Sequence, residues 1–157
     1  MKSKRLLKTA VIIAMGCLLI FVSFNDARGS DWVPYGKDVT DNTYFYDRES
    51  ILNVSKGIIK VWTKKVYSTE GRAELIFGYM KDGVPASGYE FLSETKYREF
   101  INCVDEKYRM TNMTDYTSDG IVLDSFEEEN SAWINVTPDS IVAILMKEVC
   151  KKTKESK

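Results

Sequence analysis

The sequence of 157 residues contains no histidine. This absence excludes Ser-His-Asp and Cys-His nucleophilic sites, and it removes the usual ligands of zinc and haem iron. The chain also lacks a glycine-rich phosphate loop and a Cys-x-x-Cys pair, so phosphate binding of that type, thioredoxin-type redox chemistry and c-type haem attachment have no site. We therefore predict a protein that is not an enzyme, with no catalytic residue, no metal site and no cofactor.

The N-terminal residues have the pattern of an export signal. A segment rich in lysine and arginine, residues 2–8, precedes an uncharged apolar run, residues 9–24, and small residues follow around Gly29. We predict a secretory signal peptide over residues 1–29, cut after Gly29. Two alternatives stay open. One is an uncleaved anchor, although the apolar run is shorter than the roughly 20 residues that cross a bilayer as a helix. The other is lipid attachment at Cys17.

Cysteine is scarce, with three in the chain, and Cys17 lies inside the predicted signal. The mature domain therefore keeps one pair, Cys103 and Cys150, and an even number of cysteines in an exported domain indicates a disulfide. This bond would close a loop of about 48 residues, which corresponds to about 4 kcal/mol of stabilisation in the chain-entropy account. Two free, buried thiols are the alternative.

Removal of the predicted signal makes the chain acidic. Residues 1–29 hold five of the 22 lysines and arginines and one of the 23 acids, so residues 30–157 have 17 bases, 22 acids and a net charge of −5. Because nucleic-acid affinity comes mainly from neutralising phosphates, such a domain is a poor nucleic-acid binder. We predict no nucleic-acid partner, and we interpret the lysine-rich residues 151–157 as a basic flexible tail.

Residues 133–150 predict a short strand followed by an amphipathic helix. Thr137 is a favourable N-cap, and Pro138 suits the first helical position, where a missing N–H costs nothing. Apolar residues recur at spacings of three and four and form one wide face, which needs a surface to cover. These residues are Ile141, Val142, Ile144, Leu145 and Val149.

Most of residues 31–132 have the composition of β-strands. The best strand is residues 58–67, which are rich in branched and aromatic side chains. Residues 53–57 are predicted to form a turn, and Asp119-Gly120 suits the tight turn of a hairpin.

One segment, residues 70–81, fits either a helix or a strand, and we predict a helix. The segments together predict a single α+β domain over residues 30–150. Its fold is an antiparallel β-meander sheet packed against a C-terminal α-helix, with one sheet-to-helix disulfide.

Carboxylates remain as candidates for chemistry. Residues 115–120 match the opening of a calcium loop, but the twelfth position of that loop is Phe126 instead of glutamate, so a hairpin turn is the preferred interpretation. A glycosidase needs two acids that face each other. Acids near the predicted strands leave this alternative open, although a solvated sheet face accounts for them more simply. They are Glu90, Glu94, Glu99, Asp105 and Glu106.

Aromatic residues are plentiful in the mature chain. Most are expected in the core and in cross-strand pairs, and the others would supply a binding face, because Tyr and Trp give contact area at low entropic cost. Lys60, Lys64 and Lys65 would add a local basic patch, with a solvated strand face as the simpler interpretation. The sequence identifies no ligand-binding residue.

Several short motifs spread over most of the mature chain belong together. They are Trp32-Val33, Ile59-Lys60-Val61-Trp62, Cys103 followed by Arg109, Asp115-Tyr116 with Asp119-Gly120, Trp133 with Thr137-Pro138-Asp139-Ser140, and Val149-Cys150. In this combination the chain resembles the bacterial surface-adhesin protein E-like domain family. The resemblance implies a small exported domain with an antiparallel sheet, a C-terminal helix and a disulfide between them. It also implies a surface or envelope protein that binds other macromolecules, since the named member is an adhesin for host matrix and serum proteins.

We therefore predict an exported, non-enzymatic binding module, adhesin-like, that recognises a protein or another macromolecular ligand through its sheet face. Its expected location is the periplasm, the outer cell surface or the medium, and its only membrane contact is through the signal segment before cleavage. Two alternatives stay open: a periplasmic envelope assembly or inhibitory protein that acts on a neighbouring exported protein, and a carboxylate-based hydrolase.

Overall fold

The computed structural model describes residues 29–155. The predicted signal, apart from Gly29, lies outside the described residues, and so does Cys17. The signal, its cleavage and the two alternatives to it therefore stay predictions. No helix within residues 29–155 has the length and apolar character needed to span a membrane.

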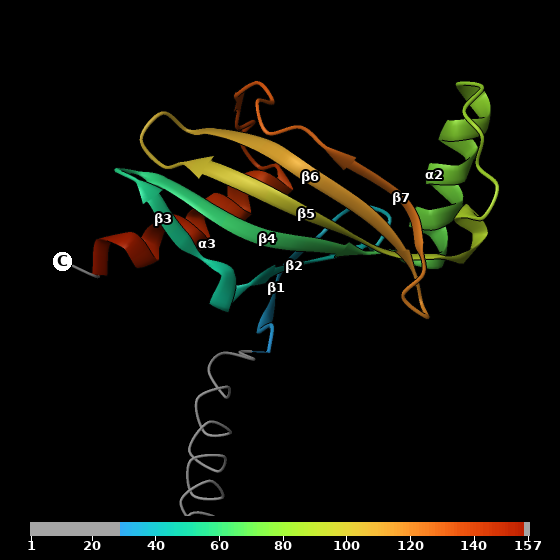
Figure 1. The fold of residues 1–157 in the computed structure, drawn as a ribbon, viewed down its shortest axis with the longest axis horizontal. Helices are drawn as coiled ribbons and strands as arrows, with labels where there is room; N and C mark the ends of the chain where they lie inside the picture. Colours follow the sequence, from blue (N-terminus) through green and yellow to red (C-terminus); the bar gives the residue numbers. More distant parts are fainter. Residues whose placement is uncertain (1–28, 156–157) are drawn as a thin grey trace, which may run out of the picture.

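An antiparallel sheet of eight strands forms the body of the described domain (Figure 1). Six strands lie in the order β1-β2-β4-β5-β6-β7, while β3 pairs with β4 and β8 pairs with β6. The strands are β1 Trp32–Lys37, β2 Thr43–Asp47, β3 Leu52–Ser55, β4 Ile58–Val66, β5 Leu92–Asn102, β6 Lys107–Thr117, β7 Val122–Glu127 and β8 Ile134–Asn135. Strands that pair in the sheet are close to each other in the sequence, and every pair is antiparallel. The predicted antiparallel α+β fold is therefore confirmed.

Helical segments connect and follow these strands. They are η1 Arg48–Ser50, α2 Thr69–Lys81, η2 Tyr89–Phe91 and α3 Ile141–Glu155. The helix predicted over residues 70–81 is confirmed as α2, and it begins where it does because the Ser68 hydroxyl accepts a hydrogen bond from the Gly71 N–H at 2.8 Å. In Figure 1, α2 lies at one end of the sheet, whereas α3 runs along the strands.

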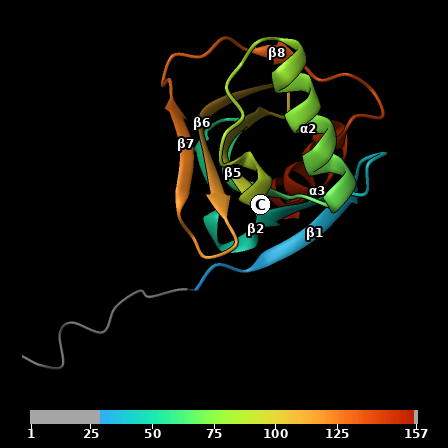
Figure 2. The same ribbon diagram turned by 90° about the vertical axis from the view of Figure 1, so that its right-hand side faces the viewer.

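The core forms where α3 meets the concave face of the sheet. Leu145 and Val149 of α3 are fully buried, in one cluster with Ile59, Val61 and Ile101 of β4 and β5. Figure 2 shows the strands curving around this helix. The apolar helix face that the sequence predicts is therefore the face that closes the core.

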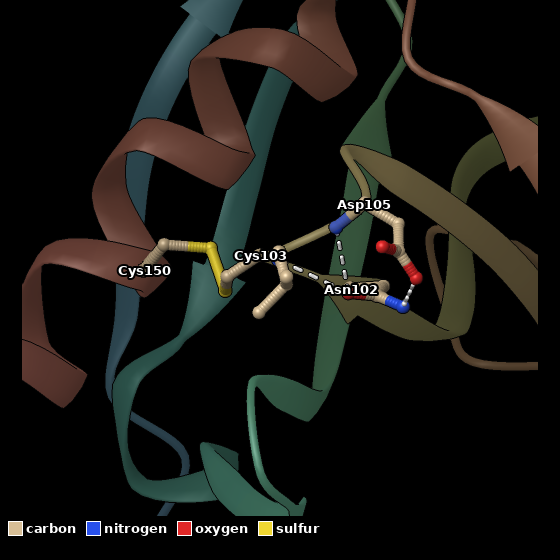
Figure 3. The surroundings of a disulfide bond; sticks show 5 residues. Asn102, Cys103, Asp105 and Cys150 are labelled. Carbon is tan, nitrogen blue, oxygen red and sulfur yellow. Dashed lines mark hydrogen bonds between the residues drawn. A yellow bond between two sulfur atoms is a disulfide. The ribbon is translucent and has the colours of Figure 1, made fainter.

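The disulfide Cys103–Cys150 ties α3 to the turn between β5 and β6 (Figure 3). The two Cα atoms lie 5.8 Å apart, although 47 positions separate them in the sequence. Asn102 shapes the turn, because its Oδ1 accepts from the backbone N–H groups of Val104 and Asp105, both at 3.0 Å. Its Nδ2 donates to the Asp105 carboxylate at 2.9 Å. The predicted sheet-to-helix bond is confirmed.

The predicted start of α3 is wrong. Asp139 has a φ of 61°, in the left-handed region, so the chain does not enter the helix at Thr137 and Pro138. Ser140 is the N-cap instead: its Oγ accepts from the Ala143 N–H at 3.2 Å and donates to the Thr137 carbonyl at 2.7 Å. Thr137 thus contributes its backbone to the cap.

Two other boundaries differ from the prediction. Residues 53–57, predicted as a turn, contain most of β3, and the turn itself is confined to Lys56 and Gly57. Gly57 has a φ of 78°, which glycine adopts without strain. At the other end of the domain, α3 continues to Glu155 and so includes most of the segment predicted as a flexible tail.

The cap assignment predicts a difference between two neighbouring variants. Ser140→Ala is expected to lower the free energy of unfolding by about 1 kcal/mol, because it removes an N-cap acceptor. Thr137→Ala is expected to change it by less than about 0.5 kcal/mol, as for an ordinary surface substitution. Urea unfolding of the oxidised protein, followed by circular dichroism, measures both. A larger loss for Thr137→Ala than for Ser140→Ala would contradict the cap.

Candidate functional site

The alternation of side chains along β4 and β5 gives the sheet two chemically different faces. Successive side chains of a strand point to opposite faces. The register of these strands pairs Lys60 with Phe100 and Lys64 with Lys96 on one face, whereas Val61 lies on the face that packs against α3. We refer to the face of Lys60 and Lys64 as the outer face, and to the face against α3 as the inner face.

The outer face gathers bases and aromatic rings from five strands and the segment before β8. Its bases are Lys60, Lys64, Lys96, Arg98, Lys107 and Arg109. Its aromatic residues are Trp32, Phe45, Trp62, Phe100, Tyr116 and Trp133. Since α3 packs on the inner face and α2 lies at the end of the sheet, no helix of residues 29–155 covers the outer face.

Two of these lysines lie against aromatic rings. Lys64 Nζ is 4.8 Å from the centroid of the Trp32 ring and 5.5 Å from that of Phe45. Lys96 Nζ is 4.8 Å from the centroid of the Tyr116 ring. At these distances the ring quadrupole attracts the ammonium group. The rings therefore restrict two side chains that are otherwise among the most mobile on a protein surface.

Acidic residues complete the arrangement. Lys64 and Lys96 lie directly opposite each other on neighbouring strands, a placement that is repulsive by itself. Glu94 lies between them, with its two oxygens 3.1 Å from Lys64 Nζ and 3.2 Å from Lys96 Nζ. Arg98 Nη2 is 3.3 Å from a carboxylate oxygen of Glu127. Six bases thus face two acids that pair with them, and the outer face keeps an excess of positive charge in an acidic domain.

The guanidinium group of Arg109 lies against two aromatic rings, one on the neighbouring strand β5 and one in the segment before β8. Its guanidinium carbon lies 4.8 Å from the centroid of the Phe100 ring and 5.0 Å from that of Trp133. Its Nε is buried and has no hydrogen-bond acceptor within the described residues. The stacking of the guanidinium on aromatic faces therefore fixes its position, without an acidic partner that would neutralise it.

The basic patch suggested by Lys60, Lys64 and Lys65 is divided between the two faces. Lys60 and Lys64 lie on the outer face, because residues an even number of positions apart in a strand share a face. Lys65 lies on the inner side, where its Nζ is 4.6 Å from the centroid of the Tyr67 ring and 3.6 Å from Asp38 Oδ2. The basic patch, which the sequence left as the less simple interpretation, therefore cannot include Lys65, because consecutive strand residues alternate between faces.

The inner face contains a cavity of about 600 Å³ near the start of α3. Tyrosines from four strands line it, namely Tyr35, Tyr44, Tyr97 and Tyr108. The side chains of Ile141 and Val142 form the wall contributed by α3, and Phe126 and Ile134, which are exposed, lie at the rim. The cavity therefore lies at the N-terminal end of α3, the helix that closes the core.

One buried acid lies among these tyrosines. Glu99 is 8% exposed, and its Oε2 accepts a hydrogen bond from the Thr63 hydroxyl at 2.8 Å. Burial raises the pKa of Glu99 to about 7, and the bond from Thr63 only partly offsets this effect. Burial, together with the nearby charge of Glu99, raises the pKa of Tyr35 well above its usual range.

The five acids considered for a hydrolase do not converge. Glu94 lies on the outer face, Glu99 lies in the inner cavity, and Glu90 is exposed on η2. Asp105 and Glu106 are exposed in the turn after β5. The lining of the inner cavity also includes Glu128, which is exposed and was not among these five. Apart from Asp105 and Glu106, which are consecutive residues in an exposed turn, the structure brings together no pair of these acids.

The segment that resembles a calcium loop, residues 115–120, contains a hairpin turn, which is the interpretation that the sequence favoured. Asp115 points into the sheet, where it is 3% exposed and accepts hydrogen bonds from Tyr89 and Thr95. Asp119 accepts from the Thr117 hydroxyl within the turn, and Gly120 has a φ of 83°. No group of three potential ligands among the described residues is arranged to hold a metal ion.

A second, larger hollow of about 960 Å³ adjoins the disulfide. The turn between β3 and β4, the turn after β5, and the outer side of α3 line it, with Gly57, Val104 and Met146 among the contributing residues. Lysines and exposed acids share this lining, and it contains no buried ionisable side chain. Of the two cavities, the inner cavity is therefore the one that holds a buried ionisable side chain.

Comparisons with known proteins give one consistent result. The sequence model of surface-adhesin protein E matches residues 32–151. Two solved structures of protein E from Haemophilus influenzae share the fold. The first, crystal form II, has a TM-score of 0.52 at 14% identity and covers 81% of this chain and 91% of its own. The second, from a non-typeable strain, has a TM-score of 0.50 at 17% identity and covers 83% and 82%. No curated protein sequence matches the chain.

The buried acid predicts a pH-dependent stability difference. The pKa of Glu99 is raised in the folded protein from its ordinary value of 4.5 to about 7, so the folded state binds the proton more tightly than the unfolded state. The wild-type protein therefore loses stability as the pH rises through this interval. Glu99→Gln keeps an acceptor for Thr63 and avoids the buried charge.

At pH 8, Glu99→Gln is expected to be more stable than the wild type by roughly 3 kcal/mol, and at pH 4.5 the difference is expected to approach zero. Urea unfolding at both pH values measures it. Glu90→Gln, which removes an exposed carboxylate, is the control. A Glu99→Gln variant that is less stable than the wild type at pH 8 would contradict the assignment.

Proposed function

The chain belongs to the surface-adhesin protein E family, and from this premise we propose that it is an exported, non-enzymatic binding module that recognises a macromolecular partner through its outer face. The matched region spans all eight strands and α3 up to residue 151, so the premise applies to the whole described sheet. Export is the expectation from the N-terminal pattern, and it places the protein in the periplasm, on the cell surface or outside the cell.

The feature that carries this proposal is the restrained set of cations on the outer face. A long basic side chain normally loses conformational freedom when it binds a partner, and this loss weakens binding. Lys64, Lys96 and Arg109 already lie against aromatic rings before any partner arrives. The free-energy cost of ordering them on binding is correspondingly smaller.

The charge of the outer face indicates the chemistry of the partner. Its excess of bases favours a macromolecule with an acidic surface, such as an acidic protein segment or a sulfated polysaccharide. The exposed aromatic edges, including Trp133 at 36% exposure, add apolar contact area beside these charges. Arg and Trp side by side are the residue types that most often dominate a protein interface.

A pair of charge-matched variants tests the proposal. The first carries Lys60→Gln, Lys64→Gln and Lys96→Gln on the outer face. The second removes the same charge at exposed positions elsewhere, through Lys56→Gln, Lys81→Gln and Lys147→Gln. Binding to immobilised heparin and to immobilised polyglutamate, two polyanions of different backbone, is measured at low and physiological salt.

The outer-face variant is expected to bind at least about tenfold more weakly at low salt, because three interactions worth roughly 0.5 kcal/mol each are lost. The control variant is expected to stay within about twofold of the wild type, and added salt should narrow the difference. Equal losses in the two variants, or no binding of the wild type to either polyanion, would overturn the outer face as the binding surface.

A further inference from the structure

The inner cavity has a chemistry unlike that of the outer face. Four tyrosines and Phe126 surround a single buried acid, and no lysine or arginine of the described residues lines the cavity. The rings of Tyr35 and Tyr44 are tilted against each other, with their centroids 6.1 Å apart and an angle of 55° between their planes. These two rings thus form one aromatic wall of the cavity.

The buried acid of this cavity has no basic partner among the described residues. Glu99 Oε2 accepts from Thr63, and Glu99 forms no ion pair with a basic residue among the described residues. The titratable residues lining the cavity are the four tyrosines and Glu128, and α3 contributes only Ile141 and Val142. Beside this lining, Lys65 lies with its Nζ 5.6 Å from the centroid of the Tyr44 ring, and its charge is paired with Asp38 at 3.6 Å. A buried carboxylate with one hydrogen bond and no counter-charge is unfavourable, and a bound cation would remove this penalty.

A second polar group in the lining also lacks a partner. Ser131 Oγ is buried and has no hydrogen-bond partner among the described residues. It belongs to the segment between β7 and β8, which contributes to the lining of the cavity. A buried hydroxyl without a partner is uncommon, and a ligand with a polar group would satisfy it.

These features select among ligand classes. The negative faces of aromatic rings and a carboxylate both attract cations, and both disfavour anions. A metal ion is a poor fit, because hard cations take six or more oxygen ligands and the cavity offers one buried carboxyl group. A volume of about 600 Å³ lies in the usual range for small organic ligands.

We propose that the inner cavity binds a small organic cation of the alkylammonium class, with Tyr35, Tyr44 and Tyr97 around the cationic group and Glu99 as its counter-ion. Phe126 and Ile134 at the rim border the entrance, and Ser131 Oγ bonds to a polar substituent of the ligand. This site is separate from the outer face, because the sheet lies between them.

Choline and 3,3-dimethylbutanol provide the decisive pair of probes. The two molecules have nearly the same shape, and only choline carries a positive charge. Isothermal titration calorimetry with the wild-type protein at pH 8 is expected to show choline binding at least about tenfold more tightly than the neutral analogue. Equal affinities for the two probes would overturn the proposal. So would the absence of choline binding at the highest choline concentration that the titration reaches.

Two variants locate the binding event. Glu99→Gln is expected to weaken choline binding by at least about tenfold, and Glu90→Gln, which removes the same charge from an exposed position, is expected to leave it within about twofold. The outer-face variant with Lys60→Gln, Lys64→Gln and Lys96→Gln is expected to bind choline like the wild type. Choline binding that responds to the outer-face changes and not to Glu99→Gln would contradict the site.

The pH dependence of the wild-type protein gives a readout that needs no variant. Choline pairs with the ionised form of Glu99, so its affinity is expected to rise between pH 6 and pH 8 as this group loses its proton. The tyrosines stay neutral over this range, because burial raises the pKa of Tyr35, Tyr44 and Tyr97. An affinity that does not change with pH would exclude Glu99 as the counter-ion.

Discussion

The attachment of α3 to the concave face of the sheet is the constraint on which the rest of the structure depends. An antiparallel sheet of this size needs cover on one face, and Leu145 and Val149 supply it from the helix. The bond between Cys103 and Cys150 fixes the second half of that helix to the turn after β5. With one face closed in this way, the outer face is left to polar and aromatic side chains, which pair with each other instead of with a second layer.

The limited length of this cover also explains the inner cavity. α3 begins after Ser140 and does not extend over the whole concave face. The part of this face that lies before the start of the helix is lined by tyrosines instead of by helix side chains. At the far end, Asn42 anchors the start of α2 by accepting from the Ser68 N–H at 2.9 Å, and Gly71 leaves room for its side chain.

The sequence predicts the elements whose signals are local, and it misses what depends on register. Strands rich in branched and aromatic residues, the apolar stripe of α3 and the cysteine pair can be predicted from residue types alone. The place of Glu99 among the tyrosines is not, because it depends on the pairing of β4, β5 and β6 and on a register shift at Arg98–Glu99. The cap of α3 is missed for a similar reason: Thr137 and Pro138 fit the local rule, and the left-handed conformation of Asp139 moves the helix start beyond them.

The most direct test of this account compares the urea unfolding of the oxidised protein with that of the same protein after reduction of its disulfide, at one pH and one protein concentration. If the covalent tie holds α3 on the sheet, reduction lowers the free energy of unfolding by about 4 kcal/mol. Unfolding curves that coincide before and after complete reduction would show that the closed inner face, and with it the arrangement of both surfaces, does not depend on this tie.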